Sequence, residues 1–76
     1  MIRITQHRAK CIGCGNCVEV AQNNWEMNDA DGKADLIGAK ENKGFHIILS
    51  SDDDYEPNLE AQNICPVKII KVEKVK

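Results

Sequence analysis

The stretch Cys11-Ile12-Gly13-Cys14-Gly15-Asn16-Cys17, with Cys65-Pro66 far along the chain, decides the fold of this 76-residue sequence. Two residues separate each cysteine of the first stretch from the next, so one short loop can present three thiolates to a common centre. A fourth thiolate must come from elsewhere, and Cys65 is the remaining cysteine. Gly13 and Gly15 favour a tight loop, because glycine adopts unusual backbone angles and lacks a Cβ.

This cysteine pattern predicts an iron–sulfur centre. Three closely spaced cysteines plus a remote Cys-Pro are the ligand set expected for one cubane cluster. We therefore predict that one [4Fe–4S] cluster is bound by four residues, Cys11, Cys14, Cys17 and Cys65. A structural zinc site is the alternative for four thiolates, although zinc sites usually take two separate cysteine pairs.

At these residues the sequence resembles the bacterial-type low-potential ferredoxins, whose usual run is Cys-x2-Cys-x2-Cys-x3-Cys-Pro. Here Ala21-Gln22 stands where the last Cys-Pro of that run would be, and no second cysteine triplet follows. The resemblance therefore implies a member with a single cluster. It continues through the segment after the first helix and the closing segment from Cys65, and fails mainly between Ile37 and Asn58.

The resemblance also implies a function. Members of the family shuttle single electrons between redox enzymes in transient complexes, and the redox chemistry belongs to the cofactor. Some members carry aspartate at the position of Cys14 or hold a three-iron cluster. With Cys14 present we expect the [4Fe–4S] form, which converts to [3Fe–4S] on oxidation if Cys14 is exposed. We expect no enzyme, because no general base, activated nucleophile or substrate loop is recognisable.

Hydrophobic periodicity and turn residues predict an α+β chain. Strands are expected at 2–5, Trp25–Asn28, 33–37 and 67–75, and helices at 17–24 and 56–64, the second with Leu59 and Ile64 facing inward. The resemblance implies a small ferredoxin-like βαββαβ domain spanning residues 1–76, with its two terminal strands paired. Near residues 38–54 we expect an inserted hairpin or strand, with a loop at 38–44 and a strand at 45–49.

Net charge and hydropathy limit the binding partners and the cellular compartment that we expect for this chain. The net charge of −2 makes nucleic acid and anionic membrane surfaces unexpected partners. No apolar run approaches the length of a membrane span and no secretory signal is recognisable, so a soluble, cytoplasmic monomer is expected. A chain of 76 residues has a small core, so cluster binding should be part of its folding free energy.

Residues beside the cysteines are expected to tune the cluster. Ile12 and Val67 should shield it from water, and Arg8 and Lys10 would raise its reduction potential if they lie near it. Besides the electron carrier, two other functions stay open at this point. One is an iron–sulfur redox or oxygen-sensing regulatory module, and the other is the structural zinc domain.

Overall fold

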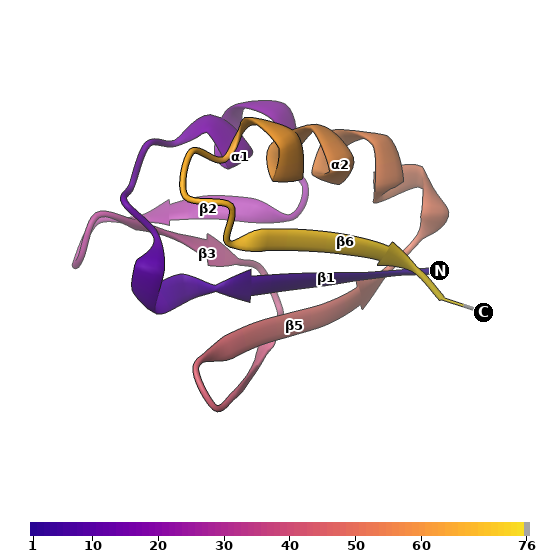
Figure 1. The fold of residues 1–76 in the computed structure, drawn as a ribbon, viewed down its shortest axis with the longest axis horizontal. Coiled ribbons are helices and arrows are strands. Elements are labelled where there is room, and N and C mark those ends of the chain that lie inside the picture. Colours follow the sequence, from indigo (N-terminus) through magenta and orange to yellow (C-terminus); the bar gives the residue numbers. More distant parts are fainter. Residues whose placement is uncertain (76) are drawn as a thin grey trace.

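Two antiparallel sheets and two α-helices make up the computed structural model, which describes residues 1–75 (Figure 1). The strands are β1 (Ile2–His7), β2 (Trp25–Asn28), β3 (Lys33–Leu36), β4 (Lys40–Asn42), β5 (Phe45–Ser50) and β6 (Ile70–Lys74). The α-helices are α1 (Asn16–Val20) and α2 (Tyr55–Ile64), and two short 3-10 helices are η1 (Arg8–Lys10) and η2 (Asp52–Asp54). Of the sequence, only position 76 lies outside the described residues.

The main sheet has the strand order β4-β5-β1-β6, with antiparallel neighbours. Ile4 of β1 lies opposite Ile48 on one side and Val72 on the other. The predicted pairing of the two terminal strands is therefore confirmed. Figure 1 shows α2 running over the β6 side of this sheet, while the β2–β3 hairpin forms a separate two-stranded sheet.

The inserted hairpin near residues 38–54 is confirmed, but the expected loop at 38–44 is wrong in part. Its middle forms β4, which pairs with β5 through the register Glu41↔His46. Lys43 and Gly44 make the turn, with φ of 55° and 90°. Because β5 pairs along the whole of β1, the insertion extends the main sheet on the side away from β6.

The inward face of α2 also differs from the prediction. Asn58 and Ala61 are fully buried, whereas Leu59 is half-buried and Ile64 is 37% exposed. Asn58 can be buried because its amide is fully used. It accepts a hydrogen bond from Trp25 Nε1 at 2.7 Å and donates to Asn24 Oδ1 and to the Asp54 carbonyl, each at 2.8 Å.

Two element boundaries are corrected as well. Helix α1 ends at Val20, four residues before the expected end, because Ala21 leaves the helical conformation with φ of −136°. The Ala21 carbonyl then accepts from the backbone of Asn24 and Trp25, which turns the chain into β2. Strand β6 begins at Ile70, since a turn after Cys65 holds Lys68 at a φ of 54°.

Ala21 stands where the last cysteine of a Cys-x2-Cys-x2-Cys-x3-Cys-Pro run would be. It is 3% exposed and belongs to the same buried cluster as Trp25 and Ala61. Core packing and the hydrogen bonds of Asn58 therefore occupy this region. No helix within residues 1–75 is both long enough and apolar enough to cross a membrane.

Candidate metal centre

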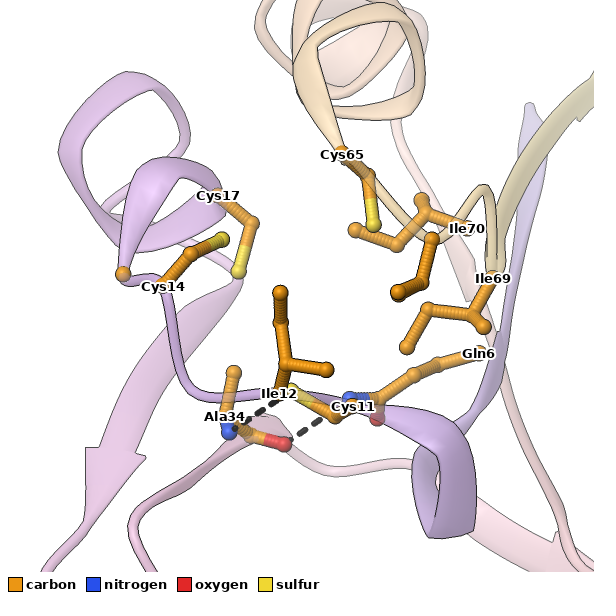
Figure 2. A pocket seen from close by; sticks show the side chains of 11 residues that line it. Gln6, Cys11, Ile12, Cys14, Cys17, Ala34, Cys65, Ile69 and Ile70 are labelled. Carbon is orange, nitrogen blue, oxygen red and sulfur yellow. Dashed lines mark hydrogen bonds between the residues drawn. The ribbon is translucent and has the colours of Figure 1, made fainter.

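All four cysteines line one recess between the two helices and the hairpin (Figure 2). Cys11 follows η1, Cys14 lies in the loop, Cys17 belongs to α1 and Cys65 directly follows α2. Figure 2 shows Cys14 and Cys17 on one side of the recess, Cys65 across it and Cys11 at its base. The recess thus brings together cysteines that are far apart in the sequence. The other lining residues are Gln6, Ile12, Gly15, Ala34, Val67, Ile69 and Ile70.

The four thiols differ in their exposure. Cys17 and Cys65 are 7% and 6% exposed, Cys11 is half-buried and Cys14 is exposed. The recess therefore opens to solvent on the Cys14 side. Ile12 and Val67, which were expected to shield the cluster from water, are 62% and 38% exposed. They therefore lie at the mouth of the recess and not in its buried interior.

The cysteine loop has the backbone shape that its glycines permit. Gly13 and Gly15 have φ of 74° and 77°, in the left-handed region that favours glycine. Gly15 immediately precedes α1, so its conformation sets where the helix begins and how it presents Cys17. The loop is thus a fixed turn that delivers its cysteines from different directions.

The β2–β3 hairpin forms ion pairs and a hydrogen bond with η1, the segment that precedes this loop. Arg8 Nη1 lies 2.7 Å from Asp31 Oδ2, and Arg8 Nε lies 2.7 Å from Asp35 Oδ1. Lys33 Nζ donates to the Ala9 carbonyl at 2.7 Å. The hydrogen bond from Arg8 lowers the pKa of Asp31, and the same bond raises the pKa of Arg8. The positive charge of Arg8 is therefore paired with carboxylates of the hairpin. Neither Arg8 nor Lys10 lines the recess.

The electrostatics of the recess come from the thiols themselves. Within residues 1–75, the lining residues other than cysteine have no charged side chain. Burial raises the pKa of the Cys17 thiol to about 11, helped by the nearby Cys11 and Cys14 thiolates. A thiol must lose its proton to bind a metal, so a metal bound at Cys17 would displace that proton.

These residues fit an iron–sulfur cluster. Thiolates are its usual ligands, and backbone N–H groups commonly donate to its sulfurs. The Ala34 N–H already donates to Cys11 Sγ at 3.5 Å. Among the described residues, no three His, Cys, Asp or Glu side chains are placed to hold a single metal ion.

Gln6 is a polar residue of the recess that the sequence analysis missed. Gln6 is fully buried in β1, where it continues the inward-facing series that begins with Ile2 and Ile4. Its Nε2 donates to the Ala34 carbonyl at 2.8 Å. The available signal was a polar residue at an inward position of an otherwise apolar strand face.

Comparison with protein families matches residues 7–72 to the 4Fe–4S single cluster domain of Ferredoxin I. Among solved structures, the chain is similar to wild-type Hydrogenobacter thermophilus ferredoxin 1, with 20% identity, a TM-score of 0.77 and coverage of 99% of this chain and 100% of that one. It is also similar to ferredoxin I from Desulfovibrio africanus, with 28% identity, a TM-score of 0.62 and the same coverage. No curated protein sequence matches the chain significantly.

Proposed function

The chain belongs to the family of 4Fe–4S single-cluster domains of ferredoxin I, and we propose that the ligands of its cluster are Cys11, Cys14, Cys17 and Cys65. The protein is a ferredoxin-type electron carrier with one [4Fe–4S] cluster, and it is not an enzyme. The observation that carries the ligand assignment is that thiols from both ends of the sequence line one recess without charged side chains. The family assignment also favours the electron carrier over the structural zinc domain and the regulatory module.

The residues of the recess have separable roles. A bound cluster supplies the one-electron redox change. Cys17 and Cys65 lie deepest, so we assign them to the water-excluded side, together with Ile70. Cys11 receives the Ala34 N–H, which stabilises negative charge on its sulfur. Cys14 is the exposed ligand, so iron loss to a [3Fe–4S] form should begin there.

The partners follow from electron transfer. Ferredoxins pass electrons to and from redox proteins, and we propose that this one does so as a cytoplasmic monomer in short-lived complexes with redox enzymes. Such encounters use small interfaces. The exposed edge at Ile12 and Cys14 is the part of the recess that a partner can approach most closely. The mild net charge of −2 supports the expectation that neither nucleic acid nor a membrane surface is a partner.

We also propose that all 76 residues form one domain. The pairing of β1 with β6 supports this, because it joins the two ends of the chain within one sheet. The Met1 carbonyl accepts from the Val75 backbone at 3.0 Å, which extends that connection beyond the strands. Closing the chain in this way places Cys11 and Cys65 on the same end of the molecule.

Coulometric titration of anaerobically purified protein tests the proposed function. We expect reversible uptake of one electron per chain, with bleaching of the visible absorbance on reduction. Protein that takes up no electron, or only the electrons of thiol chemistry, would contradict it. Cys65→Ser tests the ligand assignment in the same experiment, because it should abolish the reversible signal.

A further inference from the structure

Gln6 combines three properties that together are unfavourable for the stability of the fold. Its side chain is fully buried, it lies on the cysteine recess, and its Oε1 is buried without a hydrogen-bond partner. An unpaired buried acceptor is unfavourable, whereas an apolar side chain continuing the Ile2–Ile4 series would have no such cost. Departures of this kind from good packing are expected at functional positions.

The orientation of the Gln6 amide is decided by Ala34. Nε2 donates to the Ala34 carbonyl at 2.8 Å, and exchanging Nε2 with Oε1 would set two acceptors against each other. The NH₂ group carries two N–H donors, and Ala34 uses one of them. The second N–H therefore remains on a nitrogen that is fixed in place.

Cysteine sulfur is the acceptor that the recess offers to this second N–H. Among the described residues, the polar side chains lining the recess are Gln6 and the four cysteines. Ala34 links Gln6 to Cys11 through hydrogen bonds. The Ala34 carbonyl accepts from Gln6, and the Ala34 N–H donates to Cys11 Sγ at 3.5 Å. Figure 2 shows both bonds as dashed lines.

We propose that Gln6 is a positioning residue that raises the reduction potential of the cluster. Its free N–H donates to sulfur on the Cys11 side of the recess, and its bond to Ala34 holds the backbone N–H that reaches Cys11. Both donors stabilise the more negative, reduced state, so both shift the potential upward. The inference rests on the proposed ligation by Cys11.

Gln6→Met with a matched control tests this role. Methionine has similar length and no donor, and its flexibility suits an irregular site. The control is Gln62→Met: Gln62 Oε1 accepts from the Val72 backbone at 2.8 Å, so this variant also loses one side chain–backbone bond, but Gln62 does not line the recess. We expect the equilibrium constant for reduction of Gln6→Met to fall by up to about tenfold, or about 59 mV for one electron, with no change in Gln62→Met.

A measurement on the unmodified sequence keeps the proposal testable if Gln6→Met does not fold. The chain has three glutamines, Gln6, Gln22 and Gln62. With ¹⁵N in the glutamine side chains, electron–nuclear double resonance of the reduced protein should show a ¹⁵N coupling that persists when Gln22 and Gln62 are both replaced by methionine, because Gln6 is then the remaining glutamine.

The outcomes separate this inference from the proposed function. Absence of the ¹⁵N coupling, an unchanged potential in Gln6→Met, or an equal fall in both variants would overturn the role of Gln6. A preparation without any cluster would instead contradict the proposed function.

Discussion

Gly13 lies directly against Gly32, so closely that a Cβ on Gly13 would be 2.1 Å from the Gly32 carbonyl oxygen. The cysteine loop and the β2–β3 turn are thus in backbone contact. A side chain at Gly13 would force them apart, and with them Cys11 and Cys14. Gly15 has a similar φ of 77°, but among the described residues no atom beyond its own chain neighbourhood lies within 4 Å of its Cβ position.

Alanine substitutions at these two glycines therefore distinguish the cost of backbone strain from the cost of a steric clash. Gly15→Ala should cost only the left-handed conformation, roughly 1–2 kcal/mol. Gly13→Ala adds a clash with backbone, which cannot move like a side chain, and should cost more than about 3 kcal/mol. Anaerobic cluster loss under denaturant, followed by visible absorbance, compares the two variants. Equal sensitivity would show that the contact with Gly32 is unimportant.

The Arg8–Asp31 pair should give a pH dependence. The pKa of Asp31 is lowered by its hydrogen bond to Arg8, so the ionised carboxylate favours the folded state. This stabilisation is present above the unfolded value of about 3.9 and is lost as the pH falls through the lower folded pKa. Asp31→Asn should lose its cluster faster than the unmodified protein above about pH 4, with the difference shrinking below that.

The matched control for this pair is Asp29→Asn, in the same turn. Asp29 is exposed, and we expect this variant to lose its cluster at the rate of the unmodified protein across the range. A rate difference between Asp31→Asn and the unmodified protein that is constant with pH would contradict the ion-pair explanation.

Asn58 should be one of the most sensitive positions for stability. Asn58→Leu keeps a similar volume but leaves Trp25 Nε1 and the Asp54 carbonyl without their partner. Each buried unpaired group costs about 1–3 kcal/mol, so we expect a loss of about 3 kcal/mol in the free energy of unfolding. Asn63→Leu, at an exposed position of the same helix, should change it by less than about 0.5 kcal/mol. Similar losses in the two variants would exclude the hydrogen-bond network as the cause.

The cysteines should differ in how much their loss affects the cluster. Cys17→Ser and Cys65→Ser remove the two buried cysteines among the proposed ligands, so we expect loss of both cluster and fold. Cys14→Asp affects the exposed position and should leave a three-iron or altered cluster. Iron analysis with electron paramagnetic resonance distinguishes these results. A Cys14→Asp protein without any iron would contradict the ranking by exposure.

The sequence predicts the parts of this structure that depend on local patterns. The bounds of β2 agree residue for residue, because alternation and the turn ending in Gly32 mark Trp25–Asn28 clearly. The cysteine spacing predicts the grouping of thiols at one recess. The resemblance adds the pairing of β1 with β6, which no local pattern specifies.

The misses depend on pairings that the pattern of apolar residues does not reveal. All three residues of β4 are exposed, so this strand forms by backbone pairing with β5 and has no apolar alternation to reveal it. Asn58 is buried because Trp25 and Asn24, more than thirty residues earlier, satisfy its amide. Gln6 similarly depends on Ala34, and no sequence pattern indicates that pairing.

The iron and acid-labile sulfide content of freshly prepared, oxygen-free protein tests the central claim most directly. With Cys11, Cys14, Cys17 and Cys65 holding one [4Fe–4S] cluster, each chain should contain four iron and four sulfide. Colourless protein that carries zinc, or folded protein without iron or sulfide, would contradict the account.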